Sequence, residues 1–436
     1  MKAFAPVLLA ASLLAAPVAA RAADELVVAT VNNPHMLTMQ KMTPAFERAN
    51  PDIHVRWVTL DEGELRRQAT EDVASKGGRF DVMTIGMYET PIWARKGWLE
   101  EIRPDAAYEV NDLLPAIRSG LSWQGRLYAA PFYGESSMTL YRADLLAKAH
   151  LEMPLQPTWN EIAQLAAKLD DPRAGVHGIC LRGKPGWGDN MALVSTMVNA
   201  FGGQWFDMAW HPQVDSRPWH EAVSFYIDLL HRYGPKDAAG NSFNENLKLF
   251  DEGHCAIWVD ATVAAAFVTD PKRSQVADRV AFVQAPTART SKGANWLWAW
   301  SLAIPSDSTR KEQAQRFVRW ATSQAYVELV GRQVGWGQVP TGTRISTYKN
   351  PNFVGQAHWA MAEASAISLA NPTDSTLPRS PYVGVQFAAI PEFQSIGGTV
   401  GQAVAAALSG KVGLDEALRG AQAEAEREMK KAGYFK

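Results

Sequence analysis

The chain has 436 residues, of which 47% are hydrophobic and 20% charged, and its formal net charge at pH 7 is −2. This length is more than one hydrophobic core usually serves, so two domains are expected, and the composition excludes a disordered protein. No run is rich in Lys and Arg, which argues against a nucleic-acid partner and against an anionic membrane surface.

The first 22 residues have the pattern of a secretory signal. Lys2 supplies a positive start, an apolar stretch rich in Ala and Leu runs from Ala3 to Ala20, and residues 20–22 give a small-x-small cleavage site. We therefore predict a signal peptide over residues 1–22 and export to the periplasm. A membrane anchor is the alternative for this stretch, and no later apolar run is long enough to span a bilayer.

Strands and helices then alternate. The apolar patterns predict strands over residues 25–30, 53–60 and 80–85, with helices over 37–50 and 62–75 between them. This β-α-β-α-β order predicts an α/β fold in which helices cover a mainly parallel sheet. Within the first helix, Pro44 is expected either to kink the helix or to mark its true start.

The ends of these strands are candidate ligand sites. In open α/β sheets, ligands bind beyond the carboxyl ends of the strands. This rule singles out Asn33, Asp81 and Tyr88, which lies in the turn after the third strand. Asp81 could instead cap a helix or close a turn, and Asn33 could be an ordinary turn residue.

A second α/β region is expected over about 140–285. It contains a helix over 159–169 that begins with a capping box formed by Thr158 and Glu161. A strand over 296–304, a helix over 311–323 and a helical tail from residue 390 follow. No stretch has the composition of a long linker, so we expect two lobes joined by short crossings that permit hinge closure.

Catalytic motifs are absent from the sequence. It contains no His-Glu-x-x-His zinc motif, no Gly-x-Ser-x-Gly elbow, no phosphate-binding P-loop and no Gly-x-Gly-x-x-Gly fingerprint. We predict no catalytic residue, no metal and no cofactor. A secreted carbohydrate-active enzyme remains the competing hypothesis, because two well-placed carboxylates are enough for glycoside hydrolysis.

Two cysteines, Cys180 and Cys255, are the only ones in the chain. Export permits a disulfide, but the sequence does not show whether the two residues approach each other. A disulfide and two buried free thiols both stay open.

Tryptophan is abundant, with 16 residues. An indole face suits the C–H face of a sugar or polyol, while polar neighbours bind its hydroxyl groups. Core packing is the alternative for each tryptophan, and it is favoured for residues 296–300, whose alternation would turn one face into the core.

Several segments resemble the extracellular solute-binding proteins of carbohydrate ABC importers, the family that includes maltodextrin-binding protein. The resemblance covers nearly the whole chain after the leader, and its specificity comes from the order and spacing of its segments. These are Val27–Thr30 with Phe46–Val55, Gly78–Met83, Leu127–Asp144, Phe250–Asp260, and Ile390–Phe393 with Leu414–Leu418.

Three further segments resemble the branch of that family that binds sugar alcohols such as mannitol, sorbitol and arabitol. They are Gly178–Met191, Phe201–Asp207 and Ala294–Trp300. The resemblance implies a polyol ligand. It also implies a two-lobe periplasmic binding protein that closes on a small neutral polyol or sugar and then docks on the permease subunits of an ABC importer.

The resemblance also assigns ligand roles to single positions. Glu135 stands six residues before Tyr141, as the ligand-contacting glutamate precedes a tyrosine in the maltodextrin protein, although a salt bridge at the hinge is the alternative. The remaining candidates lie in the segments quoted above: Arg182, Trp187, Asn190, Trp258, Asp260 and Trp298. Of Trp258 and Asp260, one is expected to face the ligand, and Arg182 could instead be a structural ion-pair partner.

On this basis we predict an N-terminal lobe of residues 23–138 with about 290–345. Residues of about 139–289 with 346–436 would form a C-terminal lobe. The protein is expected to be a monomer. A binding protein for a mono- or disaccharide, and a periplasmic sensor subunit with the same fold, are the other possibilities.

Overall fold

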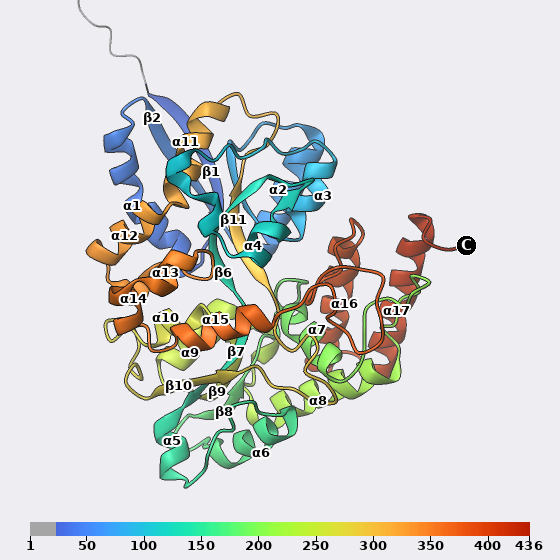
Figure 1. The fold of residues 1–436 in the computed structure, drawn as a ribbon. Coiled ribbons are helices and arrows are strands. Elements are labelled where there is room, and N and C mark those ends of the chain that lie inside the picture. Colours follow the sequence, from blue (N-terminus) through green and yellow to red (C-terminus); the bar gives the residue numbers. More distant parts are fainter. Residues whose placement is uncertain (1–22) are drawn as a thin grey trace, which may run out of the picture.

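A computed structural model describes residues 23–436, so the signal peptide predicted over residues 1–22 lies outside the described part of the chain. The molecule has two lobes, each built around its own β-sheet with helices packed on it (Figure 1). The predicted two-lobe α/β fold is therefore confirmed.

The sheet of the first lobe has five strands in the order β2-β1-β3-β11-β6. β1 pairs in parallel with both β2 and β3, whereas β11 pairs antiparallel with both β3 and β6. The strands are β1 (Asp24–Val31), β2 (Ile53–Leu60), β3 (Val82–Ile85), β6 (Ala129–Glu135) and β11 (Trp298–Ala303).

Burial along these strands follows their position in the sheet. β1 is an interior strand, and its six consecutive residues Leu26–Val31 are buried, so both of its faces are covered. β2 is an edge strand and alternates buried Ile53 and Val55 with exposed His54 and Arg56. A continuous apolar run and an alternating one are the patterns that a doubly covered strand and a half-exposed strand require.

Helices pack on both faces of the first sheet (Figure 1). A short hairpin of β4 (Ser122–Trp123) and β5 (Arg126–Leu127) extends the same lobe. The helices are α1 (Pro34–Ala49), α2 (Glu62–Ser75), α3 (Glu89–Arg95), α4 (Pro115–Gly120), α11 (Lys311–Ala321) and α12 (Gln324–Gln333).

The sheet of the second lobe has four strands in the order β10-β7-β9-β8. β7 is antiparallel to β10 and β9, and β8 is parallel to β9. The strands are β7 (Ser137–Arg142), β8 (His177–Cys180), β9 (Cys255–Ala261) and β10 (Val280–Gln284).

Helices from three parts of the chain complete the second lobe. α13 (Ile345–Lys349) and α14 (Pro351–Gln356) lie where the lobes meet, and α16 and α17 pack against α7 and α8 (Figure 1). The other helices are α5 (Ala143–Lys148), α6 (Trp159–Leu169), α7 (Asn190–Ala200), α8 (Arg217–Tyr233), α9 (Phe243–Asp251), α10 (Ala264–Val268), α15 (Ala360–Leu369), α16 (Phe393–Leu408) and α17 (Leu414–Lys431).

The crossing between the lobes is short. Ser136 alone separates β6 of the first sheet from β7 of the second, and it exchanges two hydrogen bonds with Thr262. Beside it, the Gly134 N–H donates to the Thr341 carbonyl at 2.8 Å. Gly342 approaches so closely that a Cβ atom there would overlap Gly134, and its φ of 73° also favours glycine. Short crossings that lie side by side are what hinge closure needs.

Most predicted elements are present, with shifted ends. The first helix begins at Pro34 rather than Leu37 and contains Pro44, so Pro44 does not mark its start. The capping box of Thr158 and Glu161 at the start of α6 is confirmed. None of the helices within residues 23–436 is long and apolar enough to cross a membrane.

Candidate functional site

One edge of the first sheet faces the second lobe. β6 runs in the same direction as β1, β2 and β3, because β11 is antiparallel to both β3 and β6. The carboxyl ends of these strands therefore meet at one edge. They deliver Asn33 after β1, Glu62 after β2 and Glu135 as the last residue of β6. All three residues line a hollow between the lobes.

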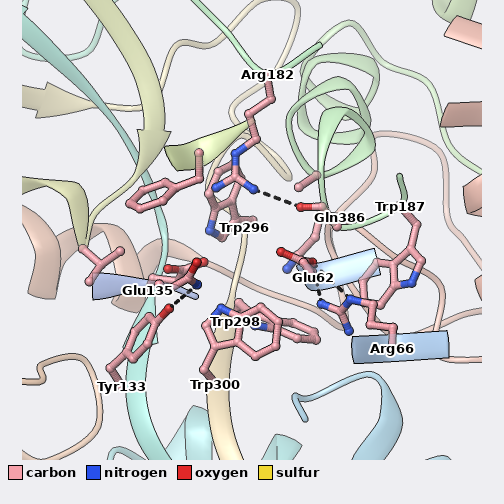
Figure 2. Close-up of a pocket in the computed structure, with 15 residues that line it drawn as sticks. Glu62, Arg66, Tyr133, Glu135, Arg182, Trp187, Trp296, Trp298, Trp300 and Gln386 are labelled. Carbon is pink, nitrogen blue, oxygen red and sulfur yellow. Dashed lines mark hydrogen bonds and ion pairs between the residues drawn. The ribbon is translucent and has the colours of Figure 1, made fainter. Parts of the chain in front are cut away.

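The hollow is small. Its volume is about 480 Å³, including the part that is open to solvent. Its walls come from both lobes (Figure 2) and consist of Asn33, Glu62, Arg66, Tyr133, Glu135, Arg182, Trp187, Gly188, Ala192, Phe243, Val263, Trp296, Trp298, Trp300 and Gln386.

Trp296, Trp298 and Trp300 all line this cavity. Residues two apart in an extended chain point to the same side, so the alternation predicted from the sequence is present. This face is buried within the hydrophobic core, as the sequence favoured, and it also forms a wall of the cavity (Figure 2). Gly86, directly after β3, leaves the space that the Trp298 ring fills, and a Cβ atom there would overlap the ring.

Arg66 joins the two lobes through an aromatic contact. Its guanidinium lies 3.9 Å from the centre of the Trp187 ring, which belongs to the second lobe, and 4.9 Å from that of Trp298. Glu62 accepts from its Nη2 at 2.8 Å, and buried Glu89 accepts from its Nη1. Carboxylates on one side and indole faces on the other satisfy the buried cation.

Arg182 is held from behind by its own lobe. Asp260 accepts from its Nε at 2.9 Å and from its Nη2 at 2.6 Å, and the Gly188 carbonyl accepts from Nη1 at 2.9 Å. Asp260 also accepts from the Trp258 indole N–H at 3.0 Å. Asp260 and Trp258 are fully buried and lie outside the cavity lining, so in this structure they position Arg182 behind the cavity wall.

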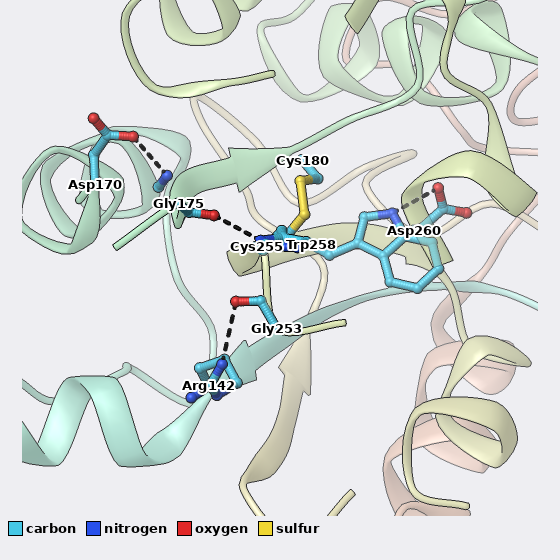
Figure 3. The surroundings of a disulfide bond; sticks show 10 residues. Arg142, Asp170, Gly175, Cys180, Gly253, Cys255, Trp258 and Asp260 are labelled. Carbon is cyan, nitrogen blue, oxygen red and sulfur yellow. Dashed lines mark hydrogen bonds between the residues drawn. A yellow bond between two sulfur atoms is a disulfide. The ribbon is translucent and has the colours of Figure 1, made fainter. Parts of the chain in front are cut away.

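A disulfide between Cys180 and Cys255 answers the question that the sequence left open. It joins neighbouring strands β8 and β9, with Cα atoms 5.9 Å apart. Figure 3 shows the bond beside Trp258, whose indole points to Asp260. Because Cys180 precedes Arg182 by two residues and pairs in register with Trp258, the bond fixes the strands that present the Arg182–Asp260 pair.

Glu135 differs from the other charged groups of the cavity. Glu135 is buried, with only 7% of the residue exposed. Even so, none of the described residues forms a hydrogen bond or ion pair with its carboxylate. Burial raises the pKa of Glu135 to about 8; the Arg182 guanidinium opposes this rise, and the carboxylates of Asp260, Glu62 and Glu363 add to it.

Several buried N–H donors around the cavity are also unpaired. Within residues 23–436, the indole nitrogens of Trp187, Trp296 and Trp298 have no hydrogen-bond partner. Buried polar groups in native proteins are normally satisfied. Donors and a free carboxyl around one small cavity provide both kinds of group that a hydroxylated ligand needs. No group of three or more His, Cys, Asp or Glu in the described chain is placed to hold a metal ion.

Five of the ten residues proposed from the sequence line the cavity, namely Asn33, Glu135, Arg182, Trp187 and Trp298. Their ligand contacts remain a prediction. Asn33 donates from its amide nitrogen to the Tyr133 hydroxyl at 2.9 Å, which fixes both side chains at the cavity wall.

The structure does not bring Asp81 to the cavity. Asp81 precedes β3, so it lies at the amino end of that strand rather than the carboxyl end. Its carboxylate accepts from the Val27 N–H at 3.0 Å and from the Ser308 hydroxyl at 2.7 Å. This is the turn-like structural role that the sequence left open as the alternative.

Tyr88 and Asn190 lie one layer behind the cavity wall. The Tyr88 hydroxyl donates toward the Ile390 carbonyl at 3.0 Å, and its ring packs 5.0 Å from that of Trp187. Asn190 is fully buried and donates to the Gly401 carbonyl at 2.9 Å. Tyr88 thus supports Trp187 across the lobes, and Asn190 attaches the start of α7 to α16.

Sequence reasoning missed several lining residues. Glu62 and Arg66 begin the helix after β2, so the strand-end rule that selected Asn33 could have found them. Tyr133 lies two residues before Glu135 on the same face of β6. Gln386 comes from a segment without regular structure and had no signal in the sequence.

Two lobes joined by short crossings, with a polar and aromatic cavity closed between them, define a hinged ligand-trapping protein. The chain belongs to the bacterial extracellular solute-binding protein family, whose model matches residues 31–328. Members of this family are binding proteins of transporters and not enzymes, so the competing hypothesis of a secreted carbohydrate-active enzyme was wrong.

Two close relatives extend this assignment along the chain. A mannitol-binding protein of Pseudomonas aeruginosa is 50% identical over 429 residues, which cover 98% of each chain. The structure of an ABC transporter solute-binding protein from Agrobacterium vitis with bound D-mannitol is 52% identical, with a TM-score of 0.93 over 94% of this chain and 100% of that one.

A more distant solved structure shares only the fold. The solute-binding protein from Agrobacterium radiobacter in complex with ribitol has 23% identity and a TM-score of 0.82, over 92% of this chain and 98% of that one.

Proposed function

We propose that this chain is the periplasmic component of an ABC importer that captures a linear sugar alcohol, with mannitol first and sorbitol and arabitol next. The observation that carries the proposal is the cavity between the lobes, which is walled by four tryptophans and lined by Arg182 and Glu135. The similarity over nearly the whole chain to a mannitol-binding protein supports the same ligand class.

The chemistry of the walls suits a neutral polyol. Indole faces can cover C–H groups, the free indole N–H groups can donate, and Glu135 and Gln386 can both donate and accept. The small size of a cavity bounded by both lobes favours one ligand of monosaccharide size over a long oligosaccharide. Mono- or disaccharide binding is the alternative.

Capture follows from hinge closure. In the open form, ligand would meet one wall, and closure would bring Arg66 onto Trp187 and exclude water. Ligand shifts the open–closed equilibrium only by the contacts that it gains in the closed form. The contact of Arg66 with Trp187, the bond from Tyr88 to Ile390 and the bond of 3.2 Å from Asn244 to Asn32 all cross between the lobes.

The rest of the transport cycle lies outside this chain. We propose that the closed form acts as a monomer, docks on permease subunits in the inner membrane and needs no cofactor. We also propose the division into residues 23–138 with about 290–345, and about 139–289 with 346–436. The membership of the two large sheets supports this division, since β1, β2, β3, β6 and β11 build one and β7–β10 build the other.

Isothermal titration of the mature protein with D-mannitol, D-sorbitol, D-arabitol, glucose and maltose tests the proposal, followed by a check that the ligand is chemically unchanged. We expect one-to-one binding, tightest for a linear polyol. Binding of cyclic sugars alone would contradict the ligand assignment while keeping the transport function. No binding of any of the five would contradict both.

A further inference from the structure

The charged groups in and behind the cavity wall are not balanced. Arg66 and Arg182 are the guanidinium groups of the lining. Arg66 is paired with Glu62 and Glu89, and Arg182 is paired with Asp260. Glu135 is a further carboxyl in the same lining, so in and behind the wall these four carboxyl groups outnumber the two guanidinium groups.

Glu135 is the carboxyl that has no cation of its own. It ends β6, and its cross-strand neighbour on β11 is Trp298. Figure 2 shows Glu135, Trp296 and Trp298 around the same space. The Arg182 guanidinium lines the same cavity, but two of its nitrogens already donate hydrogen bonds to Asp260. A buried carboxylate without a partner is costly, whereas a cation beside it and over an indole face is favoured.

Building on the proposed function, we infer that the cavity selects its ligand by charge: it accepts a polyol with one ammonium group and rejects polyhydroxy acids. The ammonium of such an amino-alditol would take the place beside Glu135, against the faces of Trp296 and Trp298. A carboxylate ligand would meet Glu135 and Glu62, while both guanidinium groups stay engaged by protein carboxylates.

Protonation gives this inference a distinct signature. Because burial raises the pKa of Glu135 to about 8, its carboxyl is mostly protonated at pH 7 in a closed site that holds no ammonium group. An ammonium ligand stabilises the carboxylate, so at pH 7 its binding should release about one proton more than the binding of mannitol, and the affinity ratio of amine to mannitol should increase as pH rises from 6 to 8. The charged groups that act on the pKa of Glu135 are Arg182, Asp260, Glu62 and Glu363.

The test is calorimetric titration of the mature protein with D-mannitol, 1-amino-1-deoxy-D-mannitol and D-mannonate. Each titration is run at pH 7 in two buffers that differ in ionisation enthalpy, so that released protons are counted. We expect the amine to bind at least as tightly as mannitol and to release about one proton more than mannitol does. Mannonate should bind at least 100-fold more weakly than mannitol.

Two variants separate Glu135 from carboxylates outside the cavity. In Glu135→Gln, the affinity ratio of amine to mannitol should fall at least tenfold and the difference in proton release should disappear. In the control variant Glu64→Gln, whose carboxylate pairs with Arg67 on the exposed surface, the ratio should change less than threefold. Comparing ratios within one variant removes any general loss of binding or folding.

Distinct outcomes overturn the inference and the proposed function. Tight mannitol binding with a weaker amine, with mannonate equal to mannitol, or with an unchanged ratio in Glu135→Gln overturns charge selection alone. Failure of mannitol and of the amine together contradicts the proposed polyol function as well.

Discussion

The two walls of the cavity hold their arginines in different ways. Arg182, in the second lobe, is fixed by Asp260 and the Gly188 carbonyl of the same lobe, so its position does not depend on closure. Arg66, in the first lobe, pairs with Glu62 and Glu89 of its own lobe but rests its flat face on Trp187 of the other. The second wall is therefore built in advance, whereas the first is completed only when the lobes meet.

Removing the partner of Arg182 should break the prebuilt wall and have the largest effect on folding. Asp260→Ala leaves a buried guanidinium unpaired, and we expect the free energy of unfolding to fall by about 3–5 kcal/mol. Urea unfolding measures this loss. Asp251→Ala is the control, because its partner Arg273 is 36% exposed and should tolerate the loss better. Equal losses in both variants would contradict the account.

Removing the disulfide is a second test of whether the second wall is fixed within its own lobe. Replacing Cys180 and Cys255 with Ala opens a loop with a sequence separation of 75, and we expect a loss of about 2–4 kcal/mol in unfolding free energy. The bond lies behind the second wall, so the melting temperature should fall while the first-lobe contacts stay unchanged. A variant as stable as the parent in differential scanning calorimetry would show that the bond does not constrain this lobe.

Between the walls, Glu363 should make stability depend on pH. It accepts hydrogen bonds from Thr262, Thr341 and Tyr348 beside the crossings. Burial raises its pKa from the ordinary 4.5 to about 7, and the hydrogen bonds oppose this rise.

Between these two pH values the folded state binds more protons than the unfolded chain. The free energy of unfolding should therefore fall by roughly 1–3 kcal/mol as pH rises from 4.5 through 7. Glu363→Gln should flatten this decline when urea unfolding is compared at pH 5 and pH 8. The same slope in the variant and the parent would rule out Glu363 as its source.

The smallest effect is expected from a change in the first wall, which is completed only on closure. Arg66→Lys keeps the charge but loses the flat contact with Trp187, and we expect ligand affinity to fall about tenfold, or about 1.4 kcal/mol. Arg67→Lys is the control, because Arg67 pairs on the exposed surface with Glu64 and Glu71. Calorimetric titration that shows equal affinity for both variants would contradict a role in closure.

The sequence predicted the fold better than the site. The order of strands and helices predicted the first sheet correctly, because a strand buried on both faces has a continuous apolar run and a strand buried on one face has an alternating one. The strand-end rule led to Asn33, which lines the cavity, but failed for Asp81, because the rule depends on knowing which end of a short strand a residue occupies.

Long-range contacts explain the remaining differences. The alternation of Trp296, Trp298 and Trp300 gave their common face, but whether that face meets core or cavity depends on the other lobe. Trp258 and Asp260 lie at the expected strand, yet Arg182, 78 residues away from Asp260, stands between them and the cavity. Gln386 reaches the cavity from an irregular segment that no periodicity marks.

A crystal structure of the mature protein grown with D-mannitol tests the central claim most directly. The account predicts one mannitol molecule in the cavity between the lobes, covered by Trp296 and Trp298 and hydrogen-bonded to Glu135 and Arg182. Mannitol bound elsewhere on the protein, or a cavity that stays empty at saturating ligand, would contradict it.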